Sequence, residues 1–144
     1  MLNILLADDD PDDVSLFMHA LKYAHIEHEL MQVKSGDELG TFISNLHQPS
    51  PDVIFLDINM PCRNGKECLV LIRKDSRFDE VPVVMFTTST ELDDIEETFK
   101  AGANLYISKP FDFSHYAPLI RKMFAPGWKD RLLHSSRQTF VFSL

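Results

Sequence analysis

The sequence has few cysteines and no long hydrophobic run. Cys62 and Cys68 are its only two cysteines. They do not form a CxxC pair, and no pair of histidines stands at metal-ligand spacing. These absences argue against a disulfide framework and against a zinc site. We expect both cysteines to be ordinary small apolar side chains in a reducing compartment.

Positive charge is also scarce, since 14 Lys and Arg residues stand against 22 Asp and Glu residues and the formal net charge is -8. Non-specific binding to nucleic acid or to an anionic membrane needs a basic contact surface, so neither partner is expected. No apolar stretch approaches the ~20 residues of a membrane-spanning helix. Met1 leads into a strand-like segment without a secretory leader. We therefore expect a cytoplasmic protein.

Apolar segments alternate with segments of helical periodicity along all 144 residues, a length that suits one globular domain. Strands are expected near residues 3–7, 28–33, 53–57, 82–87 and 104–108. The first, third and fourth are almost wholly apolar, as in strands that are covered on both faces. The alternation predicts an α/β domain with a doubly wound parallel sheet and right-handed crossovers.

Between these strands, apolar residues recur at the spacing of one helix face. The stripes are Val14, Phe17, Met18 and Leu21; Leu39, Phe42, Ile43 and Leu46; Tyr116, Leu119, Ile120 and Met123; and a thinner one of Leu92, Ile95 and Phe99. The thin stripe predicts a looser fourth helix. Asp10 is expected to cap the first helix, with Pro11 in its first turn, and Gly102 to close the fourth.

Polar residues follow four of the predicted strands at the point where each strand ends. Asp8 and Asp9 follow the first strand and Lys109 follows the fifth, while Asp57 ends the third and Thr87 ends the fourth. The carboxyl ends of parallel strands meet at one edge of a sheet, where ligands of doubly wound folds bind. We therefore expect these five side chains to lie close together.

The acidic members of this set suit a metal site. Asp8, Asp9 and Asp57 would repel one another, and no arginine is obviously placed to neutralise them. Mg²⁺ suits a few carboxylates and a carbonyl oxygen, which Asn59 could supply. In contrast, Asp12 and Asp13 are expected to be solvated acids that favour the positive end of the first helix.

A carboxylate beside a metal ion can attack a phosphoryl donor and form an acyl phosphate. The transition state of such a transfer is loose, so positioning and charge neutralisation matter more than a general base. Lys109 could neutralise one phosphoryl oxygen and Thr87 could donate a hydrogen bond to another. Alone, Lys109 could be a surface cation and Thr87 a β-branched strand residue, but their joint placement with Asp57 favours the chemical role.

The motifs Asp8-Asp9, Asp57 with Met60-Pro61 and Gly65, Thr87-Thr88-Ser89, and Lys109-Pro110-Phe111 appear in order along the chain. In order and spacing, residues 2–124 resemble the receiver domain of bacterial two-component response regulators in their single-domain form. The resemblance implies a flavodoxin-like (βα)5 fold with strand order 2-1-3-4-5. It also implies a receiver domain over residues 1–124 and a C-terminal extension over 125–144.

By this resemblance, Asp57 accepts a phosphoryl group from a phosphohistidine on a sensor histidine kinase or histidine phosphotransfer protein. Asp8, Asp9, Asp57 and the backbone carbonyl of Asn59 would hold Mg²⁺, while Thr87 and Lys109 would contact the phosphoryl group. The protein would catalyse only its own phosphorylation and dephosphorylation.

The same resemblance assigns a switch role to Tyr106, an aromatic residue that turns inward when the Thr87 hydroxyl moves to the phosphoryl group. A partly buried strand tyrosine is the plainer interpretation. The face made by the fourth helix, fifth strand and fifth helix would contact a partner or form a homodimer. Its aromatic residues are Phe99, Tyr106, Phe111 and Phe113.

Other interpretations stay open at this stage. A phosphorylation-independent interaction module would use the same fold, whereas a haloacid-dehalogenase-like phosphatase would need Asp where this chain has Asn59. The extension is too short for a DNA-binding domain, and it could pack back, enlarge a dimer interface or remain loose. Similar tails occur in receivers associated with phytochrome-type kinases. The Lys109-Pro110 bond can adopt either isomer.

Overall fold

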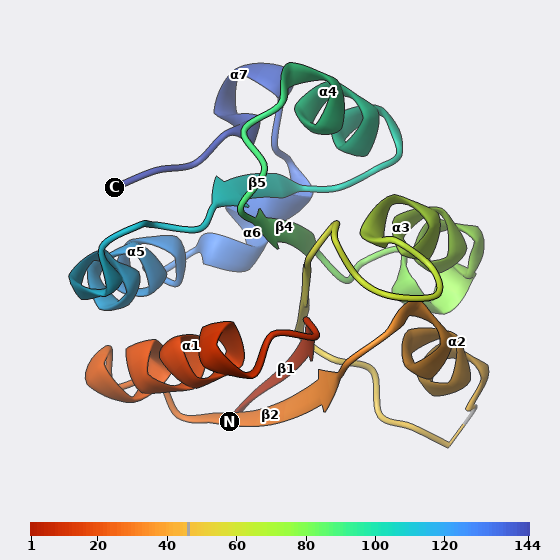
Figure 1. The fold of residues 1–144 in the computed structure, drawn as a ribbon, viewed down its shortest axis with the longest axis horizontal. Coiled ribbons are helices and arrows are strands. Elements are labelled where there is room, and N and C mark those ends of the chain that lie inside the picture. Colours follow the sequence, from red (N-terminus) through yellow and green to blue (C-terminus); the bar gives the residue numbers. More distant parts are fainter. Residues whose placement is uncertain (46) are drawn as a thin grey trace.

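A computed structural model describes residues 1–45 and 47–144. Leu46, which the sequence assigns to the second apolar stripe, lies outside the described residues. Five parallel strands form one sheet in the order β2-β1-β3-β4-β5 (Figure 1). They are β1 (Leu2–Ala7), β2 (His28–Val33), β3 (Val53–Leu56), β4 (Val83–Thr87) and β5 (Leu105–Ser108). The predicted fold class and strand order are confirmed, and each strand end lies within a residue of its expected position.

The register of the sheet aligns the carboxyl ends of four strands. Ala7 of β1 pairs with Leu56 of β3, Leu56 with Met85 of β4, and Thr87 of β4 with Ser108 of β5. Side chains that follow these strands therefore emerge at one rim. This alignment is the part of the fold that builds the site.

Helices cover both faces of the sheet (Figure 1). α1 (Pro11–Tyr23) and α5 (Tyr116–Met123) lie on one face, and α2 (Gly36–Ser44), α3 (Gly65–Lys74) and α4 (Leu92–Lys100) lie on the other. Short 3-10 turns precede β4 and α5 at Ser76–Phe78 and Phe113–His115. Two hydrophobic clusters separated by the sheet form the core, as expected for a doubly wound domain.

The local signals for the helix ends are confirmed. The side chain of Asp10 accepts hydrogen bonds from the backbone N–H groups of Asp12 and Asp13, and Pro11 begins α1. Gly102 follows α4 with a φ of 102°, a left-handed conformation that glycine adopts without strain. Thr98 is the one fully buried residue of α4, consistent with the thin apolar stripe.

Cys62 is exposed and Cys68 is buried, and both are free thiols. Burial raises the pKa of the Cys68 thiol to about 11, so the thiol stays protonated and unreactive near neutral pH. In the described part of the chain, no helix is both long and apolar enough to cross a membrane.

The C-terminal extension packs back on the domain. After Gly127, whose φ is 83°, the chain forms α6 (Trp128–Leu133) and α7 (Arg137–Phe140). Phe140 is fully buried, and Val141 forms a parallel bridge with Tyr106 at the free edge of β5. The sequence left open whether the extension packs back, enlarges a dimer interface or remains loose, and in the structure it packs back.

Candidate functional site

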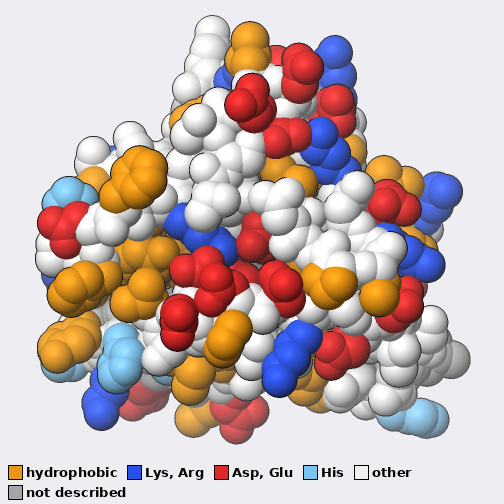
Figure 2. Space-filling view, in the orientation of Figure 1, with side chains coloured by type: hydrophobic (Ala, Val, Ile, Leu, Met, Phe, Trp, Pro, Cys, Tyr) orange, Lys and Arg blue, Asp and Glu red, His pale blue; other side chains and the backbone are white. Residues whose placement is uncertain are grey.

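The predicted site residues meet at the rim of the sheet. Asp8, Asp57 and Lys109 are buried, with 2%, 6% and 7% of their surface exposed, while Asp9 is exposed. The backbone N–H of Asp57 donates to the carbonyl of Ala7, and that of Lys109 to the carbonyl of Thr87. The strand alignment thus carries both side chains to the same place. In Figure 2, acidic side chains gather around a basic one near the middle of the face.

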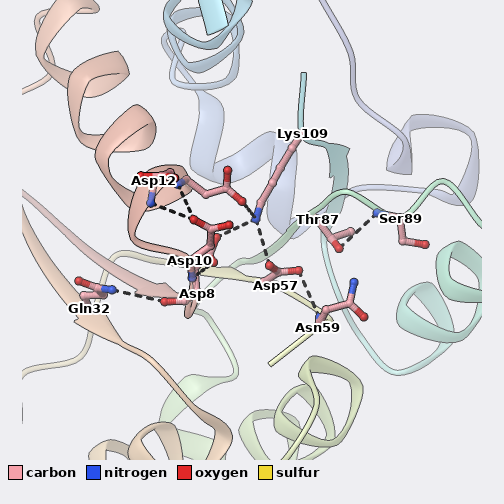
Figure 3. Close-up of polar contacts among 10 residues, drawn as sticks. Asp8, Asp10, Asp12, Gln32, Asp57, Asn59, Thr87, Ser89 and Lys109 are labelled. Carbon is pink, nitrogen blue, oxygen red and sulfur yellow. Dashed lines mark hydrogen bonds and ion pairs between the residues drawn. The ribbon is translucent and has the colours of Figure 1, made fainter. Parts of the chain in front are cut away.

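Lys109 is the cation of this cluster (Figure 3). Its Nζ donates to Oδ2 of Asp8 at 2.8 Å, of Asp57 at 3.0 Å and of Asp13 at 2.8 Å. The sequence offered no arginine for this purpose, and Lys109 was expected to serve only a phosphoryl group. In the structure, the lysine already compensates part of the negative charge.

The expectation that Asp13 is merely a solvated acid is wrong. Asp12 is exposed as expected, but only 24% of the Asp13 side chain is exposed and it pairs with Lys109. Successive residues point about 100° apart around a helix, so one can face the rim while its neighbour faces solvent. Whether Asp12 or Asp13 faces the rim depends on how α1 lies over the sheet, and the acidic run alone does not determine that orientation.

Burial and charge change the pKa values of the cluster in specific directions. Desolvation raises the pKa of Asp8, and the nearby charge of Asp57 adds to the rise, whereas the hydrogen bond from Lys109 opposes it. Desolvation alone would lower the pKa of Lys109. Hydrogen bonds to Asp13 and Asp8 and the charge of Asp57 outweigh that effect and raise it. Lys109 is therefore a permanent cation at neutral pH.

The carboxylates are close enough to share a metal ion. Asp8, Asp9 and Asp57 each offer an oxygen atom, and these three atoms lie within 4.8 Å of one another. A set of carboxylate oxygens on a partly open rim fits a hard divalent cation. The backbone N–H of Asn59 donates to Oδ1 of Asp57 at 3.2 Å, so this residue lies directly beside the acidic group.

Thr87 and Tyr106 are linked through a residue to which sequence reasoning assigned no role. Thr87 is buried, and its Oγ1 accepts a hydrogen bond of 3.4 Å from the backbone N–H of Ser89. The carbonyl of Ser89 accepts from the Tyr106 hydroxyl at 3.0 Å and from Ser108 Oγ at 3.3 Å. Ser89 belongs to the Thr87-Thr88-Ser89 motif, which was the available signal.

Tyr106 points inward and is completely buried, whereas the plainer interpretation of the sequence predicted a tyrosine that is only partly buried. Of the other aromatic residues expected on the partner-binding face, Phe111 and Phe113 are exposed. Phe99 packs against Phe140 of the extension, with a distance of 5.1 Å between ring centroids. Two aromatic residues of this face are thus exposed, and the extension covers a third.

The Lys109-Pro110 bond, for which the sequence allows either isomer, is trans.

Comparison with known proteins identifies the family. Residues 4–121 match the model of the response regulator receiver domain. The chain belongs to this family. Receiver domains are phosphorylation-based signalling switches rather than conventional enzymes, and they interact with histidine kinases or phosphotransfer proteins.

Individual relatives agree with this assignment. Response regulator Rcp1 of Synechocystis sp. is 33% identical over 110 residues, which cover 74% of this chain and 75% of Rcp1. The structure of its Mn²⁺-bound form aligns with a TM-score of 0.77 at 28% identity, covering 85% of this chain and 91% of that one. The phosphorylated cyanobacterial phytochrome response regulator RcpA aligns with a TM-score of 0.79 at 27% identity, covering 94% and 96%.

Proposed function

We propose that this receiver is a switch that accepts a phosphoryl group on Asp57. The observation that carries the proposal is the junction of Asp57, Asp8 and Lys109, which follow three different strands and meet in a buried cluster. Burying several charges costs free energy unless they are paired. A cluster that still has excess negative charge is suited to a cation and a transferred phosphoryl group.

The phosphoryl donor we propose is a phosphohistidine on a sensor histidine kinase or phosphotransfer protein. One oxygen of the Asp57 carboxylate forms the new O–P bond, and the P–N bond to the imidazole breaks. The imidazole leaves with the electron pair of that bond and takes up a proton. A divalent cation, for which we propose Mg²⁺, would be held by Asp8, Asp9, Asp57 and the carbonyl of Asn59 and would neutralise phosphoryl oxygens.

Lys109 has a second task in this scheme. Its Nζ lies 3.0 Å from Asp57 Oδ2, so the ammonium is beside the atom that we expect to be modified. To reach a phosphoryl oxygen on Asp57, the Lys109 ammonium would need to move only with its side chain, and the backbone could stay in place. The Thr87 hydroxyl, at the end of the adjacent strand, would donate to another phosphoryl oxygen.

Hydrolysis of the acyl phosphate would return Asp57 to its starting form, with water supplying the new oxygen of the released phosphate. We propose that residues 1–124 form the receiver domain that carries out this cycle and that residues 125–144 are a C-terminal extension of the domain. Phe111 and Phe113, which are 110% and 71% exposed, are the aromatic residues available to a partner or to a second copy. That the partner-binding surface changes on phosphorylation is part of the proposal.

Beryllofluoride, which mimics a phosphoryl group on a carboxylate, tests this function against a phosphorylation-independent interaction module. We expect saturable binding to the wild-type protein that requires Mg²⁺ and is abolished in Asp57→Asn. Asp79→Asn, which alters an exposed acid elsewhere, should bind like the wild type. Binding that ignores Mg²⁺ or survives Asp57→Asn would overturn the proposal.

A further inference from the structure

The extension contacts the domain next to Tyr106. We define the tail segment as residues 137–142. Phe140 in this segment is completely buried, and its ring centroid lies 5.1 Å from that of Phe99 in α4 and 6.0 Å from that of Tyr106 in β5. Since β5 is an edge strand, the Tyr106 ring would otherwise have a side open to solvent. Phe140 closes that side.

Polar contacts hold the tail segment in the same place. The backbone N–H of Phe142 donates to the carbonyl of Tyr106 at 2.9 Å. The guanidinium of Arg137 donates twice to Oε1 of Glu96 in α4, at 2.8 and 2.5 Å. From α5, Lys122 lies over the Phe142 ring at 4.9 Å. The segment is thus fixed to α4, to the edge strand β5 and to α5, which lie on either side of that edge of the sheet.

A continuous set of contacts leads from Phe140 to the rim. Phe140 packs on Tyr106, and the Tyr106 hydroxyl donates to the carbonyl of Ser89. The N–H of Ser89 donates to the hydroxyl oxygen of Thr87. Ser89 also donates through Oγ to Asp94, which pairs with Lys66 of α3, so the loop between β4 and α4 is held from both ends. Energetic coupling between two sites is carried by contiguous packed side chains and hydrogen bonds of this kind.

We propose that the tail segment is energetically coupled to Asp57 and that Phe140 is a positioning residue for its modification. By covering Tyr106, Phe140 keeps the hydroxyl on the Ser89 carbonyl and so orders the loop that carries Thr87 before any phosphoryl group arrives. This inference rests on the proposed function. Coupling is reciprocal, so occupation of the phosphoryl site must also tighten the tail.

The first arm of the test measures beryllofluoride affinity in the full chain with Mg²⁺. Phe140→Ala should weaken binding on the order of tenfold, within the range usual for coupled sites. Phe140→Leu, which restores most of the apolar volume, should recover most of the affinity. Leu144→Ala removes an exposed apolar side chain of the same extension and should leave affinity unchanged. Thermal unfolding of each variant identifies any that fail to fold.

The second arm measures hydrogen exchange at the Phe142 amide, which bonds to Tyr106. Saturating beryllofluoride and Mg²⁺ should slow this exchange about tenfold in the wild type, by reciprocity. They should have no effect in Asp57→Asn. A role of Phe140 in stability alone would not make the tail respond to a ligand at Asp57.

The outcomes separate the two proposals. Failure of the wild type to bind beryllofluoride overturns the proposed function and the coupling together. If the wild type binds it, but Phe142 exchange is unchanged or a folded Phe140→Ala variant keeps full affinity, the coupling alone is overturned. Slower exchange that depends on protein concentration would place the tail on a second copy and would also overturn the intramolecular form.

Discussion

Lys109→Met removes the cation of the rim while keeping an unbranched apolar stem. The Nζ atom contacts three carboxylates at 2.8, 2.8 and 3.0 Å, and only 3% of the side chain is exposed. Removing one partner of a buried ion pair typically costs ~3–5 kcal/mol. Because Asp13 is partly exposed and Asp8 can take up a proton, we expect the lower end, about 3 kcal/mol, in the absence of metal.

Magnesium should reverse most of this loss. A ligand at 100 times its dissociation constant stabilises the folded state by ~2.7 kcal/mol. In the variant, the carboxylates no longer have to exchange Lys109 for the metal, so a given Mg²⁺ concentration should stabilise the variant more than the wild type. The assay is urea unfolding at pH 7 with either EDTA or Mg²⁺.

Lys129→Met is the matched control, because Lys129 is 44% exposed in its side chain and lies 4.0 Å from Asp52. Such a surface pair contributes ~0–1 kcal/mol, so this variant should unfold almost like the wild type and gain no extra response to Mg²⁺. The reasoning is refuted if Lys109→Met is as stable as the wild type in EDTA, or if Mg²⁺ stabilises Lys109→Met and the wild type equally.

Three further predictions concern neighbouring positions. Asp13→Asn removes one negative charge beside Lys109. Screened by water, one such charge is worth ~1 kcal/mol, so labelling of Asp57 by the anionic acetyl phosphate should be about fivefold faster. Asp12→Asn should not change the rate, and slower labelling of Asp13→Asn would disprove the electrostatic role. In Gly65→Ala, the new Cβ would meet the Asp57 carbonyl oxygen at 2.1 Å, so chemical unfolding should show a loss of ~2 kcal/mol or more; Gly40→Ala, where the nearest atom is 3.5 Å away, should cause none. Burial raises the pKa of Tyr106, so the folded state keeps its phenol neutral while the unfolded chain ionises, and the free energy of unfolding should fall above pH ~10. Tyr106→Phe should reduce that fall, whereas Tyr23→Phe, at an exposed site, should not. If the free energy of unfolding fell equally with pH in the two variants, the burial of the Tyr106 phenol could not be the cause.

Much of the fold follows from local signals in the sequence. Val53–Leu56 is entirely apolar and fully buried, and a short apolar run of this kind suits a central strand that is covered on both faces. The cap at Asp10 and the turn at Gly102 depend on backbone geometry within a few residues. The meeting of Asp8, Asp57 and Lys109 then follows from parallel alignment alone.

Contacts that depend on how whole elements pack could not be predicted in the same way. Asp13 and Lys109 are 96 positions apart, and their pairing depends on the angle of α1 over the rim. Phe140 reaches Tyr106 only because the chain turns at Gly127 and runs back through α6 and α7 to the edge of β5. The sequence marks the apolar end of the chain but not the surface that it covers.

The most direct measurement is the intact mass of the protein after incubation with acetyl phosphate and Mg²⁺. The wild type and Asp79→Asn should each gain the mass of one phosphoryl group, and Asp57→Asn should gain none while unfolding at a similar urea concentration. An unlabelled wild type, or equal labelling of Asp57→Asn, would contradict the assignment of Asp57 as the phosphoryl acceptor.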